Sequence, residues 1–193
     1  MPKIDNKKFY TSAIEMYGTT AKGVNWHSAS SQKLRFKILL EFLPKDMQQF
    51  TLLDAGCGFG DLYPYLQKKN KEPKNYIGVD ALQDMVAIAS NNTGCEIILA
   101  DLTKESIPQV DYVVCSGAMN TLEREETLEF IYHCYSAANK GFIFNILHGD
   151  EQSQTYNYLT TQDIKLIAKE LEVEHLHLKD DYLESDITVG FFK

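Results

Sequence analysis

The segment Leu53-Asp54-Ala55-Gly56-Cys57-Gly58-Phe59-Gly60 decides the fold, because it joins a short apolar run to a helical pattern. The apolar run Thr51–Ala55 ends in this glycine-rich turn, as a buried strand does, and a helix is expected from about Asp61. Glycine lets the backbone turn sharply and approach a ligand closely, and the first amides of the following helix can face an anionic group. The segment therefore predicts a strand, a turn and a helix, with a ligand bound at the turn.

Short apolar runs and helical patterns alternate along the chain after this segment. The runs predict six further strands: Tyr76–Val79, Glu96–Ala100, Val110–Cys115, Phe142–Leu147, Leu176–Leu178 and Ile187–Phe191. Too few residues separate the last two for the long crossover that parallel strands need, so this pair is expected to be antiparallel. The predicted fold class is therefore α/β, with a doubly wound, mainly parallel seven-stranded sheet and an antiparallel edge strand.

Capping patterns set the expected helix boundaries in the second half of the chain. Asn120 and Glu123 have capping-box spacing and predict a helix that runs to about Asn139. Its inner face is expected to carry four apolar residues: Leu128, Ile131, Tyr132 and Tyr135. After a loop from His148 to Tyr158, Thr161 is expected to cap a further helix.

The composition sets limits on location and partners. The net charge is −8, yet the first 37 positions hold seven basic and only two acidic residues. The acidic remainder repels nucleic acid, so no nucleic-acid partner is expected, and the basic segment is either a solvated helix face or a cover over an anionic substrate. No apolar run approaches the roughly 20 residues that span a bilayer, and the polar N-terminus does not resemble a secretory signal. We therefore expect a cytoplasmic protein without a membrane partner.

Residues of the metal-binding types do not form a recognisable set in the sequence. The four cysteines are far apart and include no C-x-x-C pair. His175 and His177 share one face of a predicted strand, but no third ligand accompanies them. Neither a metal site nor a disulfide framework is therefore expected.

Polar side chains follow the second, third and fourth predicted strands. Asp80 lies twenty residues after Gly60 and can accept hydrogen bonds from both hydroxyls of a ribose. Asp101 follows the third strand, in position to accept a hydrogen bond from an adenine amino group, and Ser116 follows the fourth. Open α/β sheets bind ligands at the carboxyl ends of their strands, so these residues are candidates for one site. Helix capping is the alternative role for each of them.

Over roughly residues 50–193 the chain resembles the class I S-adenosylmethionine-dependent methyltransferases. The resemblance rests on the glycine-rich turn, the two acidic residues and the reversed final strand. It implies S-adenosylmethionine as the cofactor, with Asp54 near its amino group, Asp80 on the ribose and Asp101 on the adenine. It also implies further cofactor-binding residues along the same pocket: Gly56, Gly58, Gly60, Ala81, Leu82, Leu102 and Cys115.

The N-terminal part of the chain is expected to close over this site. Residues 1–45 are predicted to form a helical cap or lid, with helices near Lys8–Tyr17 and Ser28–Leu43, and residues 46–193 the cofactor-binding methyltransferase domain. The hypothesis for the lid is that Trp26, His27 and Arg35 approach the cofactor or the acceptor. The alternative is that its aromatic residues only pack on the body. The candidate catalytic residues are Trp26, His27 and Ser116.

The resemblance implies methyl transfer to an acceptor that the sequence does not identify. The motif for amide-type nitrogens, Asn or Asp before Pro-Pro-Tyr, is absent after the fourth strand, where Cys115-Ser116-Gly117 stands. Together with the acidic body, this favours a small molecule, or a protein side chain, over nucleic acid. Two alternatives stay open: a non-catalytic S-adenosylmethionine-binding regulator or scaffold, and an NAD-dependent oxidoreductase. The second is disfavoured because Asp61 stands where the dinucleotide pattern has a glycine.

Overall fold

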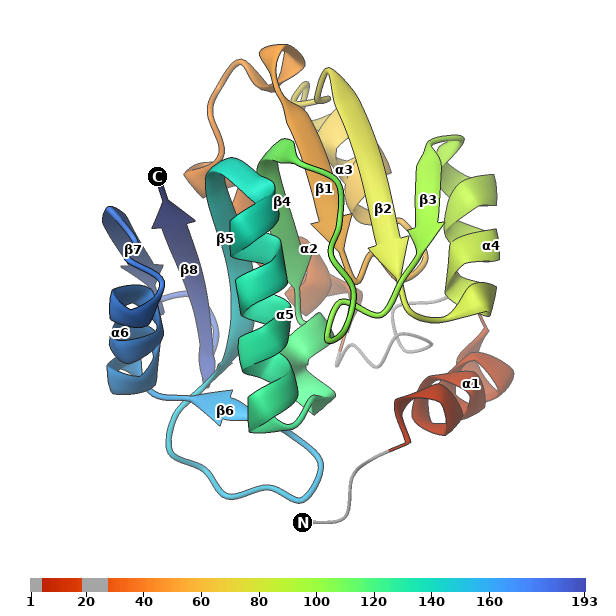
Figure 1. The fold of residues 1–193 in the computed structure, drawn as a ribbon. Helices are drawn as coiled ribbons and strands as arrows, with labels where there is room; N and C mark the ends of the chain where they lie inside the picture. The colour runs from red at the N-terminus through yellow and green to blue at the C-terminus, as the bar shows by residue number, and fades with distance from the viewer. Residues whose placement is uncertain (1–4, 19–27) are drawn as a thin grey trace.

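Figure 1 shows the α/β arrangement of the described residues, 5–18 and 28–193, in the computed structural model. The helices are α1 (Asn6–Tyr17), α2 (Ala29–Phe42), α3 (Leu62–Lys68), α4 (Gln83–Thr93), α5 (Arg124–Ala137) and α6 (Thr161–Glu170), with short 3-10 helices at Met47–Gln49 and Ala118–Thr121. The strands are β1 (Thr51–Ala55), β2 (Asn75–Asp80), β3 (Glu96–Leu99), β4 (Val110–Ser116), β5 (Ala138–His148), β6 (Tyr158–Leu159), β7 (His175–Lys179) and β8 (Asp186–Phe192).

These strands form one sheet in the order β3-β2-β1-β4-β5-β8-β7, with β6 beside the end of β5. Parallel pairing runs from β3 through β2, β1 and β4 to β5. β8 is antiparallel to both β5 and β7, and β7 forms the edge. The predicted α/β class and the mainly parallel sheet with an antiparallel edge are confirmed. The short strand β6 was not predicted, because two residues are too few to show a period.

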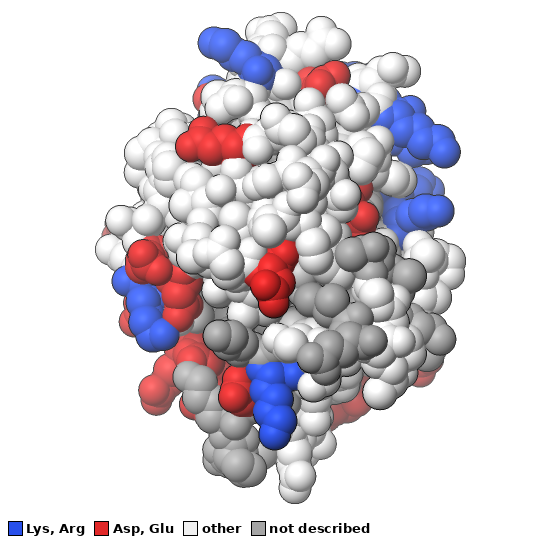
Figure 2. All heavy atoms as spheres, turned by 90° about the vertical axis from the view of Figure 1, so that its right-hand side faces the viewer, with Lys and Arg blue, Asp and Glu red and all other residues white. Residues whose placement is uncertain are grey.

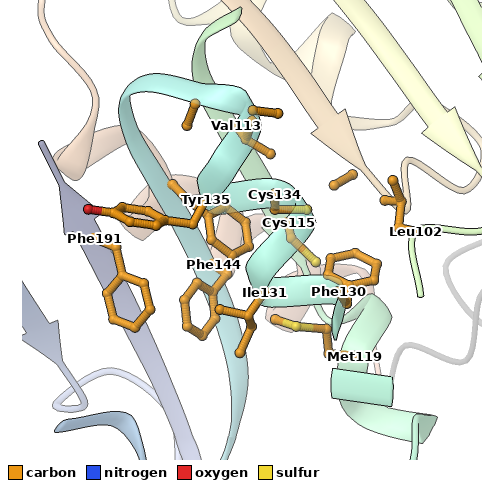
Figure 3. Packing of buried hydrophobic residues seen from close by; sticks show 14 of the residues in the cluster. Leu102, Val113, Cys115, Met119, Phe130, Ile131, Cys134, Tyr135, Phe144 and Phe191 are labelled. Atoms are coloured by element: carbon orange, nitrogen blue, oxygen red, sulfur yellow. The ribbon is translucent and has the colours of Figure 1, made fainter. Parts of the chain in front are cut away.

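Helices cover the sheet on both faces, and successive residues of the strands show which helices lie where. In β1, Leu53 belongs to the core cluster that includes α5 and α6, whereas Leu52 belongs to the cluster that includes α2 and α3. Adjacent strand residues point to opposite faces, so these two helix pairs lie on opposite sides. Figure 3 shows the first cluster, in which Ile131 and Cys134 of α5 lie beside Phe144 of the sheet.

Helix α2 is fixed to the body at its C-terminal end by Lys71. The Nζ of Lys71 donates to the carbonyl oxygens of Leu40 (3.1 Å), Leu43 (3.3 Å) and Pro44 (3.1 Å). Carbonyls at a helix C-terminus have no partner within the helix and attract cations. Burial, with a smaller contribution from the nearby Lys45, lowers the pKa of Lys71. The ammonium therefore holds α2 in a defined position over the sheet.

Three expectations about helices need correction. α5 begins at Arg124 with Glu123 as its N-cap, because Glu123 and Glu126 form the capping box. The side-chain oxygen of Asn120 instead accepts from the backbone amide of Leu147 (3.2 Å).

The inner face of α5 is also rotated from the predicted stripe. Leu128 is 37% and Tyr132 53% exposed, while Phe130 and Cys134 are buried with the correctly predicted Ile131 and Tyr135. The buried residues Thr127, Phe130, Ile131 and Cys134 have the spacing of the predicted set but begin one residue earlier in the chain. At α6 the cap is Thr160 rather than Thr161, since the Thr160 hydroxyl accepts from the amide of Asp163 (3.1 Å).

Removal of the Lys71 ammonium should loosen α2. We expect Lys71→Met to lower the free energy of unfolding by about 1 to 3 kcal/mol, because three carbonyls lose a charged donor. Urea denaturation monitored by circular dichroism measures this. Lys74→Met, at an exposed position three residues on, is the matched control and should change stability by less than about 0.5 kcal/mol. Equal stability of the two variants would contradict the role given to Lys71.

Candidate active site

A pocket lies at the carboxyl ends of the parallel strands, where the chain passes from β1 to β2 on one side and β4 flanks β1 on the other. Parallel strands end at the same edge of a sheet, so residues distant in sequence meet there. Most of the predicted site residues line this pocket: Asp54, Gly56, Gly58, Asp80, Ala81, Leu82, Asp101, Leu102 and Ser116. The sequence prediction that they share one cleft is thus met by the geometry.

The glycine-rich turn after β1 is locked against the end of β2. The backbone amides of Gly56 and Cys57 both donate to the carbonyl oxygen of Val79, at 2.8 and 2.9 Å. Gly56 has φ of +72°, and a Cβ built there would lie 2.3 Å from the Cβ of Ala118. A side chain would therefore meet both backbone strain and a steric clash. The absence of a side chain at Gly56 therefore lets the turn pack closely against Ala118, which also lines the pocket.

Asp80 binds this turn through its side chain. One carboxylate oxygen accepts from the amide of Gly58 (2.9 Å) and the other from the amide of Leu82 (3.0 Å). Burial raises the pKa of Asp80, while these amides oppose the rise. The contact with Leu82 closes a turn just before α4, but the N-cap of α4 is Leu82 and no side chain caps the helix, so Asp80 does not have the capping role that was the alternative. Asp80 lines the pocket.

Asp54 is a nearly buried carboxyl at the end of β1. It is 3% exposed, and the hydroxyl of Tyr76 donates to its Oδ2 at 2.6 Å. Burial raises the pKa of Asp54 to about 7; the Tyr76 hydrogen bond works against this rise and the charges of Asp80 and Asp61 add to it. Near neutral pH this carboxyl therefore exists in both protonation states, and a cation in the pocket would favour the ionised one.

Asp101 closes a tight turn just after β3. Its Oδ1 accepts from the amide (3.1 Å) and the hydroxyl (2.7 Å) of Thr103, and its Oδ2 pairs with Lys104. Burial alone would raise the pKa of Asp101, but Lys104 and Thr103 hold it below the usual value. The group stays an anion at the pocket wall, next to the apolar residue Leu102.

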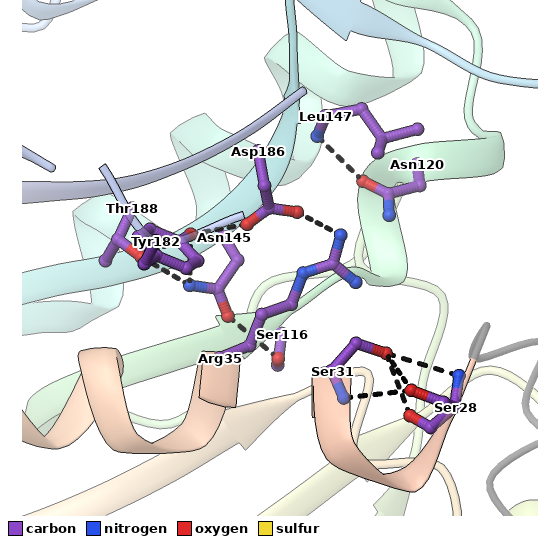
Figure 4. A network of polar contacts seen from close by, with 10 residues as sticks. All are labelled: Ser28, Ser31, Arg35, Ser116, Asn120, Asn145, Leu147, Tyr182, Asp186 and Thr188. Carbon is purple, nitrogen blue, oxygen red and sulfur yellow. Dashed lines mark hydrogen bonds and ion pairs between the residues drawn. The ribbon is translucent and has the colours of Figure 1, made fainter. Parts of the chain in front are cut away.

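A chain of polar contacts crosses from the pocket to β8 at the other end of the site (Figure 4). The hydroxyl of Ser116 donates to the side-chain oxygen of Asn145 (2.8 Å), whose amide donates to Thr188 (2.6 Å). The hydroxyls of Thr188 and Tyr182 are 2.8 Å apart, and Tyr182 donates to Asp186. Asn145 and Thr188 are fully buried, and Asp186 is nearly so. Ser116 is thus fixed from behind by the interior of the sheet.

Arg35 of α2 pairs with the same Asp186 and lines the pocket. Its side chain extends from the helix to the carboxylate, as Figure 4 shows. Burial raises the pKa of Asp186, and the Arg35 guanidinium opposes that rise. Of the residues that the lid hypothesis placed near the ligand, Arg35 is the one that the structure describes; Trp26 and His27 lie outside the described residues.

The structure adds pocket residues that the sequence did not single out as candidates. Tyr10 of α1, Thr121 and Tyr156 line the pocket. Burial raises the pKa of Tyr10 to about 12, with the nearby Asp80 adding to the rise, so its hydroxyl stays protonated. The amide of Gln32 donates to the carboxylate of Asp61 (2.9 Å), across the entrance to α3. These residues come from loops and helices whose place over the strand ends leaves no spacing signal in the sequence.

Two predicted cofactor residues do not line the pocket. Gly60 has φ of +78° and faces α4, where an added Cβ would lie 2.6 Å from Thr93. It serves helix packing. The thiol of Cys115 is fully buried among the apolar residues beneath α5, because its position on β4 points away from the cleft. The spacing of a motif does not determine the direction in which a residue points, so the sequence could not place Gly60 against α4 or Cys115 in the core.

Within the described ranges, no three or more His, Cys, Asp or Glu side chains are grouped so that they could hold a metal ion. Among the helices of these ranges, none has the length and apolarity needed to cross a bilayer.

The raised pKa of Asp54 leads to a prediction about stability. A folded-state pKa of about 7, above the ordinary 3.8, means that the stability due to the protonated carboxyl is full below pH about 4 and is lost as the pH rises through 7. Asp54→Asn removes this loss and keeps an oxygen for Tyr76. We expect the variant to gain on the order of 1 to 3 kcal/mol at pH 8 and much less at pH 5. Urea melts at both pH values test this, and a gain that does not depend on pH would exclude it.

Known methyltransferases are similar to this chain in sequence and in fold. Residues 52–141 match the family described as "Methyltransferase domain". A Mycobacterium tuberculosis protein named "Putative methyltransferase Rv1506c" is 28% identical over 109 residues, which cover 51% of this chain and 63% of that protein. The match therefore spans less than two thirds of the relative's length.

Solved structures share the fold. Magnesium protoporphyrin IX methyltransferase from Synechocystis PCC 6803, solved with bound SAH, superposes with a TM-score of 0.69 at 15% identity and covers 96% of this chain and 94% of its own. The PH0226 protein from Pyrococcus horikoshii OT3 gives 0.68 at 17% identity, over 92% of this chain and 98% of its own. At these identities the likeness is one of fold. With the domain match, the chain is similar to methyltransferases in sequence over residues 52–141 and in fold over most of its length.

Proposed function

We propose that this protein transfers the methyl group of S-adenosylmethionine to a small-molecule acceptor. The observation that carries the proposal is the pocket itself, where the carboxylates of Asp54, Asp80 and Asp101 stand at the ends of three neighbouring strands. S-adenosylmethionine has a sulfonium and an ammonium, so an acidic cleft suits its charge. Related folds support the choice of cofactor, since the Synechocystis enzyme has been solved with bound SAM as well as SAH.

The residues present fit this cofactor group by group. Asp80 would accept from the ribose hydroxyls, and Asp101, beside Leu102, would meet the adenine. Asp54 would face the ammonium, whose charge favours the ionised carboxyl. Gly56, which has no side chain, packs closely against Ala118, and both residues line the pocket. The pocket therefore offers a partner of suitable charge or shape to the sugar, the base and the amino acid.

The cofactor supplies a methyl group whose C–S bonding electrons stay on sulfur while an acceptor lone pair forms the new bond. The protein's task is to align the acceptor and to exclude water, and such orientation lowers barriers by several kcal/mol. Ser116, held by Asn145, and Tyr10 of α1 stand at the pocket wall where an acceptor would lie. We propose that α1, the first part of the predicted lid, covers the bound ligands, and that Ser116 contacts the acceptor.

The surface supports a small molecule over nucleic acid. On the face shown in Figure 2, the described Lys and Arg side chains occur in separate small groups among acidic ones, without a continuous basic band. Nucleic-acid binding depends on such a band, and the net charge of −8 opposes it.

The two alternatives predict different binding. An NAD-dependent oxidoreductase would bind a diphosphate at the start of α3, where the carboxylate of Asp61 stands and would repel it. A regulator or scaffold would bind S-adenosylmethionine without converting it. Titration with both cofactors separates the first alternative, and conversion of labelled S-adenosylmethionine in a metabolite extract separates the second.

Calorimetry tests the cofactor assignment directly. We expect S-adenosylhomocysteine to bind and Asp80→Asn to weaken its affinity at least about tenfold, because the ribose loses a charged hydrogen-bond acceptor. Asp180→Asn, at an exposed position, serves as the control and should bind normally. Binding of NADH in place of S-adenosylhomocysteine would overturn the proposed function.

The affinity should also depend on pH through Asp54. A proton competes with the ammonium for this carboxyl, so S-adenosylhomocysteine should bind about tenfold more weakly per pH unit below pH about 7. The charges of Asp80 and Asp61 act on the same carboxyl. 5′-Methylthioadenosine lacks the amino acid and should show a much flatter profile, as should Asp54→Asn with either ligand. Parallel profiles for the two ligands on the wild-type protein would refute this role for Asp54.

A further inference from the structure

The two ends of the pocket differ in charge. Asp54, Asp80 and Asp101 stand at the end formed by β1, β2 and β3, whereas the end formed by β4, β5 and β8 presents the guanidinium of Arg35. Arg35 is the one Lys or Arg among the described residues that line the pocket, and Asp186 behind it is not part of the lining. The lining also includes Asp61, which Gln32 of α2 contacts, so the described part of the pocket holds four carboxyl side chains and one guanidinium, which is paired with Asp186.

Arg35 is held in place by a buried scaffold. Asp186, 1% exposed, pairs with the guanidinium and also accepts from Tyr182, which Thr188 contacts in turn. The Arg35 side chain is 12% exposed, and Arg35 is among the residues that line the pocket. A guanidinium is a planar group with five N–H donors, suited to oxyanions, and a carboxylate behind it fixes its direction.

The neighbouring side chains at this end are uncharged and can donate hydrogen bonds. Thr121, next to Asn120, carries a hydroxyl, and Tyr10 lies near both Thr121 and Asp80. The side-chain oxygen of Asn120 is engaged by Leu147, so its NH₂ group is the part that it offers to a ligand. Donors gathered around a cation suit a ligand with negatively charged oxygens.

We propose that the acceptor is an anionic small molecule whose oxyanion group, a carboxylate or a phosphate-type group, is bound by Arg35. This inference rests on the proposed function, because it divides the pocket into a cofactor end and an acceptor end. Arg35 then selects the substrate class, and Asn120, which contacts Leu147 beside Asp186, completes the oxyanion site.

The cofactor's own carboxylate is the other possible source of an oxyanion, and the sheet order argues against it. Asp186 on β8 lies three strands from Asp54 on β1, which is about 14 Å at the usual strand spacing. The amino and carboxylate groups of the cofactor are attached to one carbon atom. With the ammonium at Asp54, the carboxylate therefore falls well short of the Arg35–Asp186 pair.

Calorimetry with two cofactor analogues separates these sources. If Arg35 binds the acceptor, Arg35→Gln should leave the affinities for S-adenosylhomocysteine and 5′-methylthioadenosine within about threefold of wild type. If Arg35 binds the cofactor carboxylate, the variant weakens S-adenosylhomocysteine alone by tenfold or more, which overturns the proposal. Failure of the wild-type protein to bind S-adenosylhomocysteine would sink the proposed function itself and is thus distinguishable.

The acceptor end is tested on wild-type protein saturated with S-adenosylhomocysteine. Benzoate and phenyl phosphate are the oxyanion probes, and benzamide and benzylamine are the neutral and cationic ones of similar shape. We expect at least one oxyanion probe to bind tenfold or more tightly than benzamide, since a hydrogen bond to a charged group is stronger than one between neutral groups. Comparison of benzoate with phenyl phosphate then distinguishes the carboxylate from the phosphate-type group. Equal affinity for all four probes, preference for benzylamine, or no binding of either oxyanion contradicts the proposal.

Variants assign that preference to Arg35. Arg35→Gln should abolish it, and Arg35→Lys should retain part of it because the charge remains. The Arg35→Gln/Asp186→Asn double variant avoids a buried unpaired carboxylate, so it should fold even if the single variant does not. Arg124→Gln is the matched control, since Arg124 pairs with Asp163 (2.6 Å) on the surface away from the pocket. Oxyanion preference that persists in the folded double variant would overturn the assignment.

Discussion

The hydrogen bond from the amide of Gly58 to the carboxylate of Asp80 is the contact on which the site depends. It joins the turn after β1 to the end of β2, and the amides of Gly56 and Cys57 strengthen the same junction through the carbonyl of Val79. Turn and strand end thereby form one rigid unit with its polar groups satisfied. The same unit holds Gly56 at a positive φ and in close contact with Ala118, and both residues line the pocket.

That arrangement brings carboxyl groups together, and no Lys or Arg of the described residues contributes to the pKa shifts of Asp54 and Asp80. Burial raises the pKa of both Asp54 and Asp80, so the protein is less stable with these groups ionised than it would be with neutral ones. A ligand with an ammonium and a sulfonium removes this repulsion when it binds. Stability of the ligand-free fold and affinity for a cationic ligand are therefore opposed at the same residues.

The local parts of the site could be predicted from sequence, and the parts assembled across the sheet could not. The glycine turn, Asp80 and Asp101 follow apolar runs directly, so alternation of strands and helices was enough to place them at one edge. Asn145 and Asp186 became visible only in the structure, because contacts between strand ends that are distant in sequence have no period. The burial of the Cys115 side chain in the core was not predicted for a related reason. The spacing identified the strand end but not the face to which the side chain points.

The N-terminal helices illustrate the same limit. Sequence patterns assign both α1 and α2 to a lid, yet they differ in how they are held. Phe36 and Leu39 of α2 belong to the core, Lys71 binds its C-terminal carbonyls, and Arg35 is paired to β8. Displacement of α2 would expose apolar surface and separate a buried ion pair, both of which are costly.

The described side chains of helix α1 bury less apolar surface than those of α2. Met16 is 71% and Tyr17 45% exposed, and its described contacts with the body centre on Tyr10 and Ala13. Elements with few buried apolar contacts open at the lowest free energy, so ligands should enter and leave by movement of α1. α2 then stays in place as a wall and keeps Arg35 aimed at the acceptor end through each cycle. We propose that α1 is the part of the predicted lid that moves and that α2 forms a fixed wall of the site.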